Sequence, residues 1–240
     1  SCQYFNGVTT TAIAVSVVDG GTTISFDGNP AGSWDIPVTV PASYIECAYT
    51  VKAQSSLYLD GNHTNSIDAD WSSMPGTFSG ERIYDDTIVY PFDGTQDTST
   101  AVFPAGAPTI AKDDGGMTQT VIGQTIHFTL TITSPLGTLR NAQVVDSLPA
   151  GLIYVSGSQS VGAGVSAPTT FTPTGPINGS APVTLTWDFG NASVTANSFT
   201  IQYDAIVANV ASNQNYTVLL NNVALNYTSA TGTNKSSTSN

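Results

Sequence analysis

Charged residues are scarce in this chain of 240 residues, at 9% of the sequence, and cations are the scarcer kind. Five lysines and arginines face 17 aspartates and glutamates, which gives a formal net charge of −12. Such a shortage of positive charge argues against nucleic acid and anionic membranes as partners. Thr, Ser, Asn and Gly fill the places of charged residues, as is typical of secreted β-rich proteins. We therefore expect an extracellular, cell-surface protein.

Histidine and cysteine are equally rare. The two histidines, His63 and His127, lie in unrelated settings, so no zinc site or Ser/His/Asp triad is suggested. We expect no enzyme and no cofactor, self-crosslinking aside. The two cysteines, Cys2 and Cys47, predict either one disulfide in an oxidising compartment or two unpaired thiols.

Long apolar runs are also missing. None reaches the roughly 18 residues that a membrane-spanning helix needs, so we expect no such helix. Helical periodicity is nearly absent, whereas apolar residues alternate with polar ones over residues 126–132, 183–189 and 199–205. Short alternating segments separated by Gly, Pro, Asn and Asp turns predict an all-β sandwich.

The chain repeats a set of landmarks once, at offsets of 153 to 156 residues. A near-constant offset over several landmarks indicates a tandem duplication. It also predicts that residue 1 falls well inside a copy, so that the chain is a window on a longer repeated protein. The paired landmarks are Trp34 with Trp187, Tyr49 with Tyr203, Asn65 with Asn221, and Trp71 with Tyr227.

A Pro-Ala-Gly-Ala-Pro linker at residues 104–108 divides the two copies. We predict an incomplete β-sandwich over residues 1–104, lacking its leading strands, and a complete one over residues 105–240. Residues 157–180 are expected to form loops with one irregular strand. The polar tail from Thr228 onward is expected to fray or to lead into a further domain.

Three polar residues of the second copy lie in phase with apolar stripes. Lys112 shares a face with Ile110, Asp146 shares one with Leu148, and Asn221 shares one with Val223. An unpaired charge at such a position would be costly, so the three are candidates for one buried site.

Two interpretations of this site stay open. A lysine buried without water loses its proton readily and becomes a nucleophile, and a buried carboxylic acid polarises an amide carbonyl. Attack of Lys112 on the Asn221 carboxamide, assisted by Asp146, would release ammonia and leave an isopeptide bond. Alternatively, Lys112 and Asp146 form a buried ion pair with Asn221 as a hydrogen-bonding neighbour.

Residues 144–152 read VVDSLPAGL, which resembles the Asp-x-Leu-Pro-x-Gly-Leu signature of a prokaryotic surface-repeat family, the "domain of unknown function eleven" group. Residues 123–132, GQTIHFTLTI, resemble its Gly-Asp-x-hydrophobic-x-Tyr strand, with Gln124 for Asp and Phe128 for Tyr. The segment from Asn65 to Gly76, with Arg82, resembles its Asn-bearing last strand and the continuation of that strand. The resemblance covers about residues 108–229 and, less completely, 30–103.

These domains are similar to the isopeptide-forming Ig-like domains of fimbrial shafts and adhesins. The resemblance implies two Ig-like sandwiches in tandem and a crosslink that joins a first-strand Lys to a last-strand Asn with help from an acid on a middle strand. Lys112, Asp146 and Asn221 follow that order, and Asn222 is the alternative partner if the register shifts by one residue. Asn65 has no such partners in its own copy, so its lysine would come from upstream sequence or another chain.

Two further sets of candidate sites are suggested by composition. Oxygen-rich loops are candidates for calcium, although solvated turns are the plainer interpretation. Six Asn-x-Ser/Thr sequons are candidates for glycosylation. The sequons are at Asn62, Asn178, Asn191, Asn215, Asn226 and Asn234, and the calcium candidates are Asp60, Asp68, Asp70, Asp93 and Asp97.

The sequence thus favours a structural repeat of an extracellular filament, stalk or adhesin, whose partners are copies of itself. Strand complementation between subunits would complete a sandwich that lacks strands. An adhesive or carbohydrate-binding module of a secreted protein, with a host or surface ligand, is the alternative.

Overall fold

The computed structural model describes residues 2–5, 9–18, 23–27, 44–50, 54, 56–67, 71–72, 83–84 and 99–240. The described residues form strands and no helix, which confirms the predicted all-β class. No helix among them is long and apolar enough to cross a membrane. Trp34 and Lys52, and the calcium candidates Asp68, Asp70, Asp93 and Asp97, lie outside the described residues.

The chain divides into two compact units. Unit 1 comprises residues 1–52 and 65–101, and unit 2 comprises residues 53–64 and 102–240. The sequence gives no signal that residues 53–64 pack with the second unit. That these units are the two copies of a duplication, with the predicted boundary at residue 104, stays a prediction.

Unit 1 contains an antiparallel sheet with the strand order β3-β2-β1-β4, and a short β6-β7 pair. A further pair, β5 and β8, has residues in both units. The strands are β1 (Cys2–Phe5), β2 (Thr10–Val18), β3 (Thr23–Asp27), β4 (Tyr44–Cys47), β5 (Gly61–Ile67), β6 (Trp71–Ser72), β7 (Ile83–Tyr84) and β8 (Ser99–Ala105).

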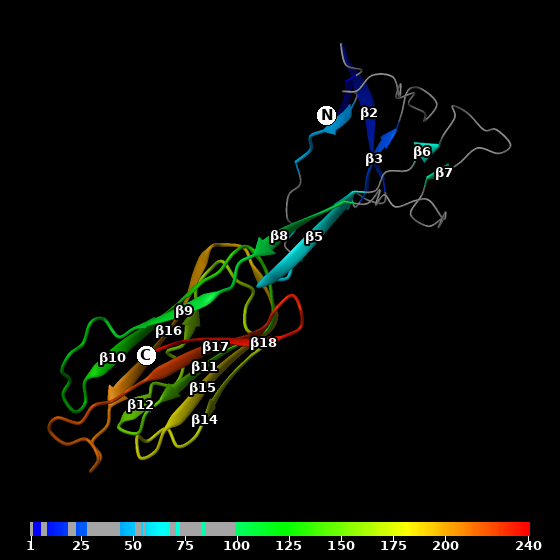
Figure 1. Ribbon diagram of the computed structural model, residues 1–240. Helices are drawn as coiled ribbons and strands as arrows, with labels where there is room; N and C mark the ends of the chain where they lie inside the picture. Colours follow the sequence, from blue (N-terminus) through cyan, green and yellow to red (C-terminus); the bar gives the residue numbers. More distant parts are fainter. Residues whose placement is uncertain are drawn as a thin grey trace. The chain divides into compact units, whose positions relative to one another are not determined.

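Unit 2 is a sandwich of two antiparallel sheets, which face each other in Figure 1. One has the order β12-β16-β10-β9, with β13 also paired to β16, and the other has the order β14-β15-β11-β17-β18. The strands are β9 (Thr109–Asp113), β10 (Thr125–Thr133), β11 (Gly137–Leu148), β12 (Leu152–Tyr154), β13 (Ser160–Val161), β14 (Thr170–Thr174), β15 (Val183–Val194), β16 (Ser198–Val207), β17 (Asn222–Thr228) and β18 (Asn234–Ser239).

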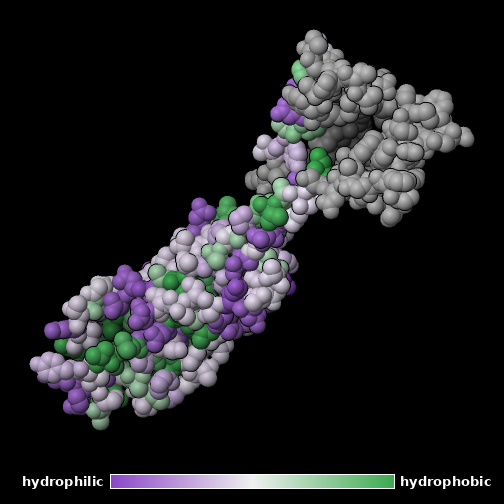
Figure 2. Space-filling view, in the orientation of Figure 1, coloured by the Kyte–Doolittle hydropathy of each residue, from purple (hydrophilic) through white to green (hydrophobic). Residues whose placement is uncertain are grey.

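The core of unit 2 lies between these sheets and follows the predicted alternation. In β10, in β16 and in β15 up to Phe189 every second residue is buried, because successive side chains of a strand point to opposite faces. Trp187 and Tyr203 are the largest fully buried side chains. The outward residues of β10 are mostly Thr, which suits a solvated strand face. Figure 2 shows hydrophilic, intermediate and some hydrophobic residues mixed over the visible surface of unit 2.

The polar tail does not fray, which corrects one of the two outcomes expected for it. Instead of fraying, residues 234–239 form β18, which pairs with β17 along its whole length. A tight turn starts the strand, with the Ser229 amide donating to the Thr233 carbonyl at 2.8 Å. The serine side chains of β18 then bind the opposite sheet. The Ile110 amide donates to Ser237 Oγ at 3.2 Å, and the Lys112 amide donates to Ser239 Oγ at 3.1 Å.

Residues 56–60 are anchored in unit 2 by Leu59, whose side chain belongs to the core. The Thr138 amide donates to the Leu57 carbonyl at 2.8 Å, and the Ala230 amide donates to the Leu59 carbonyl at 2.9 Å. Gly137, with φ of 147°, permits this approach, because a Cβ there would lie 2.6 Å from the Leu57 carbonyl oxygen. The segment is therefore held by a core side chain and by the backbone.

Candidate functional site: a buried lysine, acid, tyrosine and asparagine

Lys112 lies on β9, the end strand of its sheet, opposite Leu130 of β10. Strand alternation turns its side chain inward together with the buried Ile110, as the sequence predicted. Only 3% of the side chain is exposed. Of the two lysines that the structure describes, Lys235 is exposed, so Lys112 is the buried one.

Asp146 comes from the opposite sheet, near the C-terminal end of β11, and its side chain is fully buried. Val144 and Leu148 flank it on the same face and are buried too. The carboxylate meets Lys112 across the sandwich, with 2.5 Å between Asp146 Oδ2 and Lys112 Nζ. The predicted pair is thus brought into direct contact.

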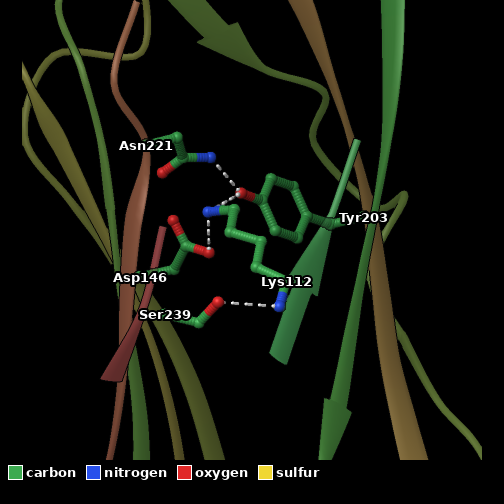
Figure 3. A network of polar contacts seen from close by, with 5 residues as sticks. All are labelled: Lys112, Asp146, Tyr203, Asn221 and Ser239. Atoms are coloured by element: carbon green, nitrogen blue, oxygen red, sulfur yellow. Dashed lines mark hydrogen bonds and ion pairs between the residues drawn. The ribbon is translucent and has the colours of Figure 1, made fainter. Parts of the chain in front are cut away.

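Asn221 joins this pair through Tyr203 of β16. The Asn221 amide Nδ2 donates to the Tyr203 hydroxyl at 2.8 Å, and Lys112 Nζ donates to the same hydroxyl at 3.3 Å (Figure 3). Asn221 immediately precedes β17 and is buried, whereas Asn222 is exposed on the other face. Of the two candidate partners, Asn221 is therefore the one whose amide lies in the site with Lys112 and Asp146.

Tyr203 was missed as a site residue by the sequence reasoning. Its position in an apolar stripe predicted a core side chain, and its ring does pack in the core, with its centroid 5.1 Å from Phe128 and 5.9 Å from Trp187. The available signal was its place among the repeat landmarks, paired with Tyr49. A buried tyrosine hydroxyl needs a polar partner, and that requirement also pointed toward the site.

Aromatic rings keep water from the lysine amine. Lys112 Nζ lies 4.8 Å from the Phe128 ring centroid and 5.8 Å from that of Tyr203. Burial lowers the pKa of Lys112 from 10.5 to about 8, although the nearby Asp146 charge acts in the opposite direction. Burial likewise raises the pKa of Asp146, against the smaller influence of Lys112. Both shifts favour the neutral amine and the neutral acid.

Two oxygens of the site have no hydrogen-bond partner, Asp146 Oδ1 and Asn221 Oδ1. Figure 3 shows each on the side of its residue that faces the other. Two acceptors cannot bind each other, and leaving buried acceptors unsatisfied costs free energy. A proton on Asp146 Oδ1 would turn that oxygen into a donor directed at the Asn221 carbonyl. The site therefore suits a protonated acid.

A second asparagine–tyrosine pair occurs in unit 1. Asn65 Nδ2 donates to the Tyr49 hydroxyl at 2.5 Å, the same donor and acceptor atoms as in the Asn221–Tyr203 bond. These four residues make up two of the landmark pairs of the repeat, Tyr49 with Tyr203 and Asn65 with Asn221. Both Tyr49 and Asn65 are exposed, unlike their counterparts.

The structure also places the cysteines and the sequons. Cys2 on β1 lies directly opposite Cys47 on β4, and Cys47 is disulfide-bonded. Asn226 is half-buried, and the other five sequon asparagines are exposed on the surface. Glycosylation of any of them stays a prediction.

The calcium interpretation gains no support from Asp60. Its carboxylate accepts a hydrogen bond from the Tyr227 hydroxyl at 2.9 Å and is thus part of the anchored segment of unit 2. The described parts of the chain contain no cluster of three or more His, Cys, Asp or Glu side chains that could hold a metal ion.

Comparison with known proteins gives matches only among solved structures, since no family model and no curated protein matches. A C-terminal fragment of the major pilin of Streptococcus agalactiae is 18% identical, with a TM-score of 0.40 over 55% of this chain and 54% of that one. The major pilin subunit BcpA of Bacillus cereus is 17% identical, with a TM-score of 0.39 over 70% and 49%.

The collagen-binding subdomain of the Enterococcus faecalis surface protein ACE is 12% identical, with a TM-score of 0.33 over 55% of this chain and 93% of that one. The chain thus spans about half the length of the two pilins. At these values the likeness adds nothing to the fold that the strands themselves show.

Proposed function

We propose that this chain is a structural subunit of an extracellular filament, stalk or adhesin, in which Lys112 and Asn221 of unit 2 join in an isopeptide bond. The observation that carries the proposal is the buried Lys112–Asp146 pair with the Asn221 carboxamide held beside it by Tyr203. A buried ion pair contributes little stability by itself, because desolvation offsets the attraction. A reaction that consumes the lysine amine gives the arrangement a use.

The chemistry starts with a proton transfer from Lys112 Nζ to Asp146, which the two opposite pKa shifts favour. The neutral amine then attacks Cγ of Asn221 while the Asp146 acid donates a hydrogen bond to the amide oxygen. Nζ gives up a further proton and Nδ2 gains one, the bond between Cγ and Nδ2 breaks, and ammonia leaves. Asp146 can then give its proton to the departing ammonia. The folded core supplies the proximity that such a slow reaction needs.

The bond would strengthen the domain because the loop that it closes holds most of unit 2. It would join β9 of one sheet to the start of β17 in the other, with 109 residues of sequence separation (221 − 112). By analogy with disulfides, closing a loop of that length restricts the unfolded chain by roughly 4 to 5 kcal/mol. Mechanical strength and resistance to proteolysis would result.

Intact mass spectrometry of the full chain tests the crosslink. We expect the wild type to weigh one ammonia less than its sequence, after glycans and the disulfide are accounted for. Lys112→Arg should restore the full mass, whereas Lys235→Arg, at an exposed lysine, should keep the loss. A wild-type mass equal to the sequence sum would reject the isopeptide bond.

We also propose that copies associate by strand addition, completing a first sandwich that lacks strands. In support, the described sheet of unit 1 ends on β3 and β4, and strand edges are templates for pairing. Light scattering at increasing concentration should show oligomers. A chain that stays monomeric at high concentration with unit 1 folded would contradict this assembly.

An adhesive module is the second candidate, favoured by one exposed loop of unit 2. Tyr216, Val218 and Leu220 are 93%, 77% and 62% exposed, which is unusual for large apolar side chains. Binding to immobilised carbohydrates that is lost in Tyr216→Ser would favour this function. Equal binding by the variant would argue against it.

A further inference from the structure

The Tyr203 hydroxyl lies between the two nitrogens of the proposed reaction, in which Lys112 Nζ replaces Asn221 Nδ2 on the Asn221 carbonyl carbon. It is 3.3 Å from Lys112 Nζ, the attacking atom, and 2.8 Å from Asn221 Nδ2, the leaving atom. Figure 3 shows this oxygen as the bridge between the two side chains. The 2.8 Å separation is within the reach of direct proton transfer, and the 3.3 Å separation exceeds that reach by about 0.1 Å, so the lysine needs to approach only slightly.

Asp146 is poorly placed to serve the leaving nitrogen. Its Oδ2 is bonded to Lys112 Nζ, and its Oδ1 faces the amide oxygen of Asn221 rather than Nδ2. Within the part of the chain that the structure describes, the hydrogen bond that Asn221 Nδ2 donates goes to the Tyr203 hydroxyl. The acid and the tyrosine therefore serve different atoms of the same amide.

We propose that Tyr203 is a catalytic proton relay, which carries a proton from Lys112 Nζ to Asn221 Nδ2 as the isopeptide bond forms. This inference rests on the proposed crosslinking function. When Nζ bonds to Cγ, it must lose a proton, which passes to the tyrosine oxygen. The tyrosine passes its own proton to Nδ2, the Cγ–Nδ2 bond breaks, and ammonia departs. Tyr203 ends with the same number of protons as it began.

The direction of the hydrogen bond reverses during this step. In the starting amide, Nδ2 donates to Tyr203, because its lone pair is delocalised into the carbonyl. Once Cγ becomes tetrahedral, Nδ2 is an ordinary amine and accepts a proton. Tyr203 can respond without moving, since rotation about its C–O bond redirects the hydroxyl proton.

Packing keeps the hydroxyl both protonated and fixed. The ring is held among Phe128, Tyr154 and Trp187, with centroid separations of 5.1, 6.3 and 5.9 Å. Burial, reinforced by the Asp146 charge, raises the pKa of Tyr203, so the group keeps a proton to donate at neutral pH. A fixed, protonated hydroxyl between two nitrogens meets the geometric requirement of a relay.

Tyr203→Phe removes the hydroxyl and keeps the ring. The full-length chain is produced by cell-free synthesis, and its loss of ammonia is followed over time by intact mass. We expect Tyr203→Phe to crosslink about 100-fold more slowly than the wild type or worse, as is usual when an acid–base group is removed. Tyr154→Phe is the matched control, because its hydroxyl bonds Gln159 instead of a reacting atom. The control should crosslink at the wild-type rate.

The outcomes separate the two proposals. A wild type that crosslinks, together with a Tyr203→Phe variant that matches its rate, overturns the relay and leaves the isopeptide bond standing. A wild type that never loses ammonia overturns the function itself. Near-ultraviolet circular dichroism confirms that each variant is folded before rates are compared.

The crosslinking rate in heavy water distinguishes proton transfer by Tyr203 from a purely structural effect of the substitution. If Tyr203 moves protons in the rate-limiting step, the wild type should slow more in heavy water than Tyr203→Phe does. Equal slowing of the two proteins would mean that the hydroxyl only orients Asn221, and the relay would be rejected.

Discussion

The chain contains two asparagine–tyrosine pairs with the same donor and acceptor atoms, in very different surroundings. In unit 2, Asn221 and Tyr203 are buried and share their site with Lys112 and Asp146. In unit 1, Asn65 and Tyr49 are exposed to solvent. In the proposed reaction the hydrogen bond alone is not sufficient, because a lysine and an acid are also needed. Beside the second pair the structure places a lysine and an acid whose charges burial disfavours.

The largest effect should come from removing the lysine of the buried site. Lys112→Met leaves Asp146 without its partner in the core and also prevents the crosslink. Removing one member of a buried pair costs about 3 to 5 kcal/mol. We expect the melting temperature of unit 2 to fall by roughly 10 °C or more in scanning calorimetry. Lys235→Met, at an exposed lysine, should leave the melting temperature almost unchanged, and an equal fall in both variants would contradict the role of burial.

A second substitution, which prevents the crosslink, should reveal how the titration of Lys112 changes stability with pH. Asn221→Ala removes the reacting amide, so Lys112 stays a free amine. Its pKa is about 8 in the folded state and 10.5 in the unfolded state. The unfolded chain then binds more protons between those values, so stability should rise with pH across that window, by roughly 3 kcal/mol in total. The raised pKa of Asp146 acts at the acidic end, where its contribution is lost as pH rises through the folded pKa.

Denaturant unfolding at a series of pH values measures this slope. If the wild type is crosslinked, its Lys112 nitrogen does not titrate, so the rise above pH 8 should be absent. If both proteins show the same slope, Lys112 has not reacted.

An effect of intermediate size is expected from a substitution that disturbs residues 56–60 and leaves Lys112, Asp146, Tyr203 and Asn221 unchanged. Gly137→Ala would bring a Cβ against the Leu57 carbonyl at a positive φ, which should displace residues 56–60 at a cost of about 1 to 3 kcal/mol. Hydrogen exchange of the Thr138 and Ala230 amides should increase, while the loss of ammonia stays complete. A variant that no longer crosslinks would show that the segment and the site are coupled.

The smallest effect should come from the exposed pair. Asn65→Ala removes a hydrogen bond between two exposed side chains, so we expect a stability change within about 1 kcal/mol and no change in the number of ammonia molecules lost. Chemical denaturation and intact mass measure the two quantities. An additional ammonia retained by Asn65→Ala would show that the exposed pair also reacts, with a lysine from elsewhere.

Strand alternation was sufficient to predict the sandwich and to bring Lys112, Asp146 and Asn221 toward a common interior. The role of Tyr203 was not predictable in that way, because a tyrosine in an apolar stripe has the pattern of a core residue. Strand β18 was missed for the opposite reason, since Asn-Lys-Ser-Ser-Thr-Ser has no apolar face. Its serines bind backbone amides instead of burying carbon, and hydropathy does not detect that interaction.

Those serines have a consequence for assembly. Ser237 and Ser239 occupy the outward amides of Ile110 and Lys112, which would otherwise be open to a strand from another molecule. Hydroxyl groups here substitute for a missing neighbour strand, and they satisfy the donors without offering a new ladder to extend. We therefore expect unit 2 to resist edge-to-edge aggregation along β9, so that copies of the protein meet through other surfaces.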